Sequence, residues 1–176
     1  EHTAQYRGQA RAIAQQLLDR QSNYSPALNL LGRIALDEGF YERAEHYLQF
    51  ALNQTPDDAG CWYSLGHVKL ATGHYDDALT HFSRSLELAP EETRAATSLV
   101  YTFARQGNVV QAFNGYRQLF QLHPNDAHIR AKLFEVSRHI QADSYQPALA
   151  DDVVRWLKLD KVDHDGLAPL TASLLR

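Results

Sequence analysis

The same residue types recur every 34 positions through the middle of this chain. Several columns keep this step over three copies: glycine (Gly39, Gly73, Gly107), alanine (Ala44, Ala78, Ala112), proline (Pro56, Pro90, Pro124), leucine (Leu31, Leu65, Leu99) and a large apolar residue (Leu48, Phe82, Tyr116). So many columns at one period indicate an internal repeat, in which each copy folds into the same unit and stacks on its neighbour.

The first part of each repeat predicts a helix. In the second copy, Trp62, Leu65 and Gly66 follow one another at i, i+3 and i+4, which places them on one face of a helix from about Gly60 to Thr72. Gly73 then supplies the left-handed residue at which helices commonly end.

The second part of each repeat predicts a second, antiparallel helix. Asp76 and Asp77 stand near its start, where negative charge suits the helix dipole. Ala78 allows two helices to approach closely, Phe82 packs one turn later, and Pro90 prevents the helix from continuing. Each repeat is therefore expected to be a helical hairpin.

This pattern resembles the tetratricopeptide repeat. The second copy carries its W-x2-L-G, G-x-Y, A-x3-F and P signature at Trp62, Leu65, Gly66, Gly73, Tyr75, Ala78, Phe82 and Pro90. The resemblance implies an all-α, right-handed superhelical solenoid of antiparallel helix pairs. We expect a partial repeat with only its second helix over 1–24, full repeats over 25–58, 59–92 and 93–126, a divergent fourth helical hairpin over 127–158, and a C-terminal capping helix over 159–176.

Methionine is absent from the sequence, position 1 included. We therefore expect a processed chain or a fragment of a larger bacterial protein. The stretch from Tyr145 onward is similar to segments that join tetratricopeptide arrays to methyltransferase domains in bacterial proteins. An accessory role in a larger enzyme is thus an alternative to a free-standing interaction module.

The resemblance also implies which side chains face the concave groove, because the first helix of each repeat lines it in this family. The positions that match are Asn29, Arg33, Tyr63, His67, Arg94, Thr97, Tyr101 and Arg105. Chaperone binding is not expected, because Tyr63, His67 and Thr97 stand where the family's carboxylate clamp needs other residues.

The predicted groove differs in charge from the chain as a whole. The net charge is −4, yet the stretch Thr93–Arg105 contains two arginines and no acidic residue. A polar, aromatic and mildly basic groove suits an extended peptide with acidic or carboxylate groups. The alternative, that these side chains are only solvated helix faces, stays open from sequence alone.

No catalytic or cofactor motif is recognisable, so we expect a non-enzymatic scaffold without metal or cofactor. His74 and His81 are seven residues apart with Ala78 between them, which does not make a metal site. The segment Asp163–Gly166 lacks the flanking ligands of a calcium loop. Cys61, the only cysteine, lies inside a predicted helix and is expected to pack there.

Composition limits the partners. The acidic chain has no basic face for nucleic acid, and its apolar runs are too short to span a membrane. A single cysteine fits a reducing compartment, so we expect a cytoplasmic protein that binds protein or peptide partners, with weak self-association through the solenoid ends as a further possibility.

Overall fold

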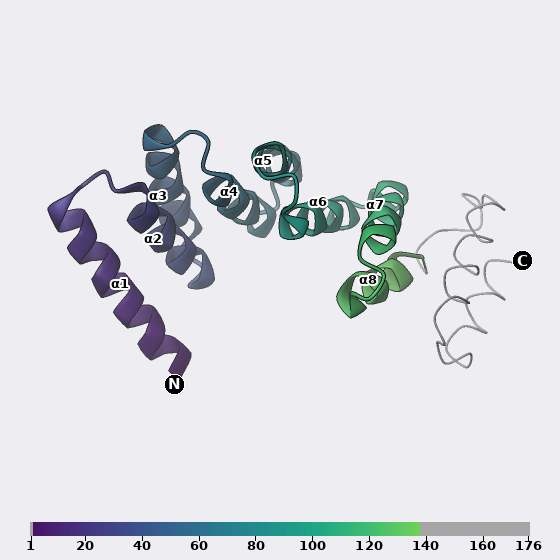
Figure 1. The fold of residues 1–176 in the computed structure, drawn as a ribbon, viewed down its shortest axis with the longest axis horizontal. Helices are drawn as coiled ribbons and strands as arrows, with labels where there is room; N and C mark the ends of the chain where they lie inside the picture. The colour runs from purple at the N-terminus through teal and green to yellow at the C-terminus, as the bar shows by residue number, and fades with distance from the viewer. Residues whose placement is uncertain (1, 138–176) are drawn as a thin grey trace, which may run out of the picture. The chain divides into compact units, whose positions relative to one another are not determined.

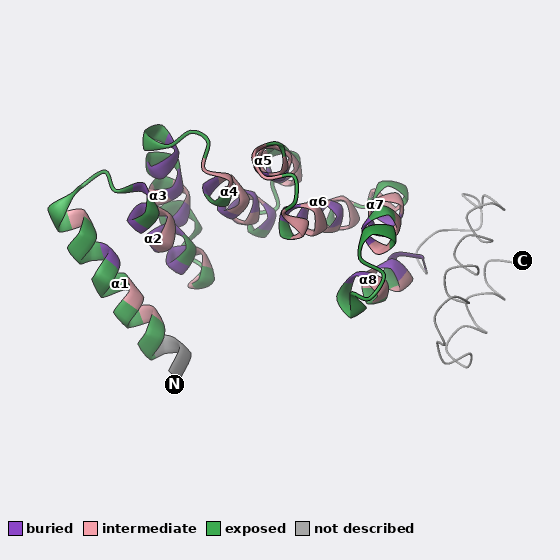
Figure 2. Ribbon diagram, viewed as in Figure 1, coloured by how far each residue is buried: buried purple, intermediate pink, exposed green. Residues whose placement is uncertain are grey.

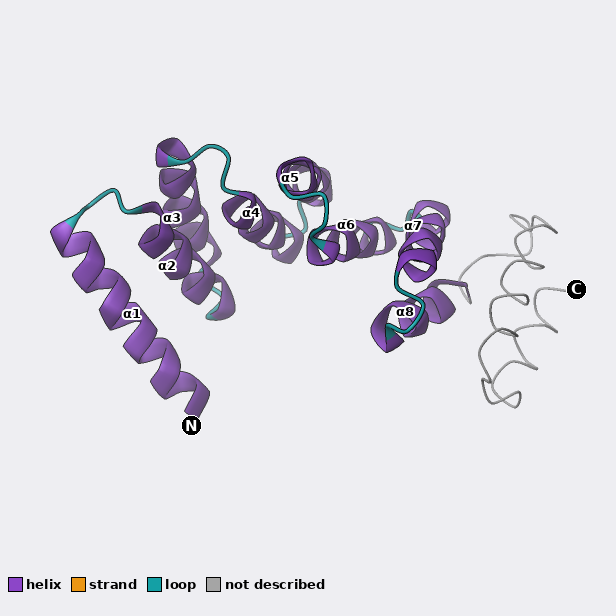
Figure 3. Ribbon diagram, viewed as in Figure 1, coloured by secondary structure: helices purple, strands orange, loops and turns teal. Residues whose placement is uncertain are grey.

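The computed structural model describes residues 2–137, which form eight α-helices and, within that range, no strand (Figures 1 and 3). The helices are α1 (His2–Arg20), α2 (Ser25–Asp37), α3 (Tyr41–Gln54), α4 (Ala59–Ala71), α5 (Tyr75–Leu88), α6 (Thr93–Arg105), α7 (Val109–Leu122) and α8 (Ala127–Ser137). The all-α solenoid class is confirmed. The expected capping helix, the whole second half of the expected fourth hairpin, and Asp163–Gly166 lie outside the described residues.

The chain divides into two units, Glu1–Asn108 and Val109–Arg176. The first unit contains α1 to α6. In the second unit, α7 packs against α8, with Phe113, Tyr116 and Ile129 almost fully buried. None of the eight helices has the combination of length and apolar character that crossing a membrane requires.

Within the first unit, each helix packs on the next one along the chain, and the first helices of successive hairpins also meet. The helix α2 packs on α4, and α4 packs on α6. Among the described residues of this unit, α3 and α5 make at most a marginal contact with each other. The first helices of successive hairpins are therefore closer together than the second helices, so α2, α4 and α6 form the inner side of this unit.

The recurring glycines end α2, α4 and α6 in the same way. Gly39 and Gly73 have φ angles of 79° and 80°, in the left-handed region. After α2, the Phe40 N–H donates to the Ala35 carbonyl (2.8 Å) and the Gly39 N–H donates to the Leu36 carbonyl (3.0 Å). This pair of bonds is the Schellman motif, which satisfies carbonyls at a helix end. The predicted helix end at Gly73 is confirmed.

Each hairpin of the first unit is closed by a large side chain packed over a helical glycine. A Cβ placed on Gly66 would lie only 2.5 Å from the Phe82 ring, and one on Gly32 would lie 2.6 Å from Leu48. Phe82 and Leu48 are both fully buried, while the outer faces of the helices are exposed (Figure 2). The glycine and large-residue columns of the repeat are therefore two halves of one contact.

Candidate functional site

A cavity of about 510 Å³ lies on the inner side of the first unit. It is bounded by α2, α4 and α6, and by the beginning of α3. The residues that line it are Arg33, Leu36, Asp37, Tyr41, Tyr63, Ser64, His67, Leu70, Ala71, Tyr101 and Arg105.

The repeat register explains why these side chains meet. Two series of residues 34 positions apart run across the cavity, one residue from each of α2, α4 and α6. The first series is Arg33, His67 and Tyr101, and the second is Asp37, Ala71 and Arg105. Equivalent positions of stacked repeats lie side by side, so each series brings together side chains of different types. The cavity is therefore lined by charged, aromatic and small residues next to one another.

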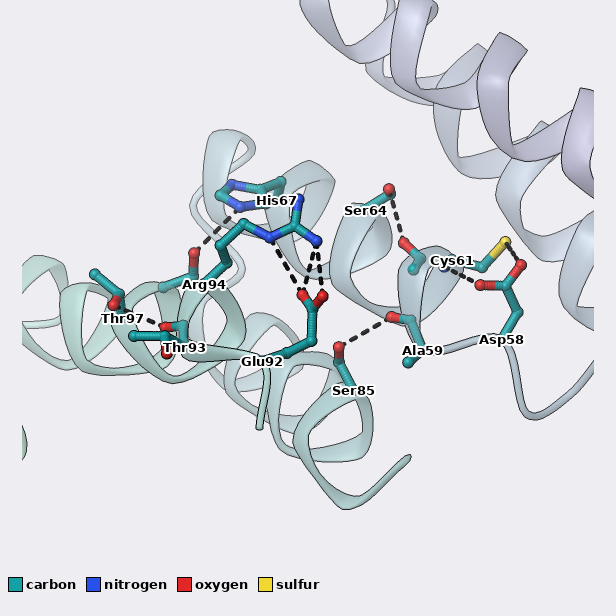
Figure 4. Close-up of polar contacts among 12 residues, drawn as sticks. Asp58, Ala59, Cys61, Ser64, His67, Ser85, Glu92, Thr93, Arg94 and Thr97 are labelled. Atoms are coloured by element: carbon teal, nitrogen blue, oxygen red, sulfur yellow. Dashed lines mark hydrogen bonds and ion pairs between the residues drawn. The ribbon is translucent and has the colours of Figure 1, made fainter. Parts of the chain in front are cut away.

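Aromatic rings make up one wall of the cavity. The ring of His67 lies 4.6 Å from that of Tyr63 and 5.1 Å from that of Phe82, both edge to face. Its Nε2 is hydrogen-bonded to the Ser98 hydroxyl at 3.2 Å (Figure 4). Burial among these groups lowers the pKa of His67, so the imidazole is neutral at pH 7. The wall is therefore fixed and amphipathic but carries no charge.

The positive charge comes from two exposed arginines. Arg33 forms no ion pair with any residue of the part that the structure describes. Arg105 donates a hydrogen bond from Nη1 to the Tyr101 hydroxyl at 3.1 Å, and its guanidinium lies 5.8 Å from the centre of that ring. The hydrogen bond and the nearby tyrosine oxygens raise the pKa of Arg105. Neither arginine is neutralised by a carboxylate of residues 2–137.

Five of the eight residues expected in the groove line this cavity: Arg33, Tyr63, His67, Tyr101 and Arg105. The other three, Asn29, Arg94 and Thr97, lie outside the cavity lining. The Arg94 guanidinium pairs with the Glu92 carboxylate at 2.8 Å, just before α6 (Figure 4). The Thr97 hydroxyl donates to the Thr93 carbonyl at 2.8 Å, and Asn29 Oδ1 is buried without a hydrogen-bond partner within the described range.

The sequence prediction missed Asp37 and Tyr41 in the lining. Asp37 could have been found from the 34-residue register, because it is two repeats before Arg105. Tyr41 is the first residue of α3, and a search restricted to first helices could not include it.

The single cysteine has a structural place, as predicted. Cys61 is fully buried, and its N–H donates to Asp58 Oδ1 at 3.0 Å, which caps the N-terminus of α4 (Figure 4). Its Sγ donates to the other Asp58 carboxylate oxygen at 3.2 Å. Burial and this carboxylate raise the pKa of the Cys61 thiol. A protonated, buried thiol is not a nucleophile.

The histidines of α5 and the turn before it do not come together. His74 Nδ1 is hydrogen-bonded to the Thr72 hydroxyl at 2.9 Å, whereas the His81 ring lies against Trp62 with their centres 5.4 Å apart. Within residues 2–137, no three His, Cys, Asp or Glu side chains are placed to hold a metal ion together.

Comparison with known proteins identifies the repeats. Residues 35–100 match the family model of the tetratricopeptide repeat. No curated protein matches the sequence.

Solved structures share the fold. MamA is similar with a TM-score of 0.71 at 18% identity, over 89% of this chain and 88% of its own. YrrB, described as a TPR protein with an unusual peptide-binding site, has a TM-score of 0.66 at 18% identity, over 88% and 80% of the two chains. An O-GlcNAc transferase mutant of Thermobaculum terrenum has a TM-score of 0.57 at 27% identity, over 66% of this chain and 24% of its own.

The tetratricopeptide signature read from the 34-residue period thus agrees with the family model over residues 35–100 and with the fold of these solved structures. Exposed charges and aromatic rings converge in the cavity between α2, α4 and α6.

Proposed function

We propose that the cavity between α2, α4 and α6 binds an extended peptide segment of a partner protein through an acidic side chain or a terminal carboxylate. The observation that carries this proposal is the convergence of Arg33 and Arg105, neither paired with a carboxylate of the described residues, with the rings of Tyr63 and Tyr101 in one cavity. The similarity to YrrB, a TPR protein with a peptide-binding site, supports a peptide as the ligand.

The two kinds of side chain have different tasks. The Arg105 guanidinium can donate charge-assisted hydrogen bonds to the acidic group of the peptide, and the Arg33 guanidinium, on the other side of α4, can donate them to main-chain carbonyls. Such bonds are stronger than neutral ones. Tyr63 is held against His67, so it offers a large contact area without losing much conformational freedom on binding. Main-chain groups of an extended peptide can use polar side chains along the cavity, such as Tyr41, which lines it and is exposed.

Isothermal titration against a library of capped peptides with one or two glutamates tests the proposal. Arg33→Gln and Arg105→Gln are each expected to weaken the best-binding peptide about tenfold, because each removes a charged hydrogen-bond donor of roughly 1.5 kcal/mol. Tyr63→Ala is expected to have an effect of similar size. The matched control is Arg84→Gln, because Arg84 pairs with Asp57 and Glu87 and lies outside the cavity lining.

Binding that survives undiminished in the Arg33, Arg105 and Tyr63 variants would contradict this function. The same holds for a loss in the Arg84 control as large as in the cavity variants, because that would indicate general charge attraction instead of a site.

A second candidate is that the array serves a larger enzyme, as the likeness of the tail to methyltransferase-linked segments suggested. The match to part of an O-GlcNAc transferase chain favours it, because that match covers only 24% of the longer chain. The sequence of the gene on both sides of these 176 residues tests it: no catalytic domain there would rule it out.

A further inference from the structure

The carboxylate of Asp37 is the unexpected group in the cavity. Asp37 lies one turn after Arg33 on α2, both side chains are exposed, and both line the cavity. Residues four apart on a helix can pair, yet Asp37 forms no ion pair with Arg33 or with any other residue of the described range. Both charges therefore remain available to a ligand.

The position of Asp37 is unfavourable for its own helix. It is the last residue of α2, and the last turn of that helix contains no basic residue. The C-terminus of a helix carries partial negative charge, so a carboxylate there is repelled, whereas Arg105 at the equivalent end of α6 is attracted. A residue that breaks a local rule without a local gain is expected at functional positions.

Asp37 and Arg105 place opposite charges at the two ends of the cavity. They belong to the same series across the cavity, with the small Ala71 of α4 between them. At the α2 end, the charges of Arg33 and Asp37 balance. At the α6 end, Arg105 is positive and no acidic residue among those that the structure describes lines the wall beside it. A ligand with two acidic groups would therefore be attracted by Arg105 at the α6 end, whereas at the α2 end Arg33 would attract it and Asp37 would repel it.

We infer that the peptide segment bound in this cavity carries opposite charges, with its acidic group at Arg105 on α6 and a basic group at Asp37 on α2. This inference rests on the proposed function and adds a second charge to it. Neighbouring helix axes are roughly 10 Å apart, so α2 and α6 are separated by about 20 Å, part of which the side chains span. At about 3.3 Å per residue, the two ligand charges are about four residues apart in an extended chain.

Fluorescence titration with capped seven-residue peptides tests the inference. One pair of peptides has lysine at position 2 and glutamate at position 6, or the reverse order, and a third peptide has glutamate at both positions. The full chain is expected to bind the better of the two mixed peptides about fivefold more tightly than the diacidic one. Asp37→Asn is expected to remove this preference, by weakening the mixed peptide and strengthening the diacidic peptide.

The matched control is Asp77→Asn, because Asp77 is an exposed carboxylate of the same unit that does not line the cavity. It is expected to leave the preference unchanged. An unchanged preference in Asp37→Asn, with both peptides weakened by Arg105→Gln, would overturn this inference and leave the proposed function intact. Binding indifferent to Arg105→Gln alone would likewise overturn only this inference. No binding of any peptide, or binding indifferent to Arg33→Gln, Arg105→Gln and Tyr63→Ala alike, would overturn the proposed function and this inference with it.

Discussion

Replacing Phe82 by alanine is expected to lower the free energy of unfolding of the first unit by about 4 kcal/mol. The Phe82 ring is fully buried, fills the space over Gly66 and supports the rings of Tyr63 and His67. Its removal leaves a cavity between α4 and α5, which cannot close because both helices also pack on other helices. Urea denaturation followed by circular dichroism measures the change.

The repeat supplies a matched control for this variant. Phe82→Leu recreates the pair that the preceding hairpin uses, Leu48 over Gly32, and is expected to cost about 1 kcal/mol. The other side of the contact is tested by Gly66→Ala. Overpacking against Phe82 is expected to lower the free energy of unfolding by about 2 kcal/mol, of which the higher helix propensity of alanine offsets about 1 kcal/mol. A loss below 1 kcal/mol in Phe82→Ala would contradict the assigned packing.

Introducing a carboxylate at position 71 is expected to weaken binding of the best acidic peptide about 100-fold. Ala71 lines the cavity between the ends marked by Asp37 and Arg105, and it is exposed. In Ala71→Glu, the new carboxylate fills part of the cavity, repels an acidic ligand and competes for the guanidinium groups. Isothermal titration measures the loss.

Ala71→Gln separates charge from size, because glutamine fills the same space without a charge. It is expected to weaken binding only about tenfold, and circular dichroism should show the helical content of both variants unchanged. If Ala71→Glu binds the acidic peptide as tightly as the unchanged chain, the peptide does not occupy this cavity.

The helical architecture could be read from the sequence because its determinants are local or periodic. The helix predicted from about Gly60 to Thr72 is observed at Ala59–Ala71. Its end is set by the backbone freedom of Gly73, and its packing by the absence of a side chain at Gly66. The turn glycine recurs in all three copies, whereas the helical glycine recurs in the first two and is replaced by Val100 in the third. The second repeat therefore predicts the helix ends of the others better than their packing.

The charge of the site could be read only in part. From the sequence, Arg94 and Arg105 look alike, because both are arginines of the same predicted helix, which has no acidic residue. In the structure, Arg94 pairs with Glu92 in the turn before α6, whereas Arg105 lines the cavity. That difference depends on side-chain placement at the helix start, which no periodicity encodes. The acidic residue Asp37 could have been predicted in the cavity, because it is two 34-residue repeats before Arg105 in the sequence.

The central claim is that the inner side of α2, α4 and α6 is the binding surface, and a nuclear magnetic resonance titration tests it most directly. ¹⁵N-labelled protein is titrated with the best peptide of the glutamate library, and amide and arginine side-chain shifts are followed. The largest changes are predicted at Arg33, Tyr63, His67, Tyr101 and Arg105. Changes confined to the outer helices α3 and α5, with these five residues unperturbed, would contradict the claim.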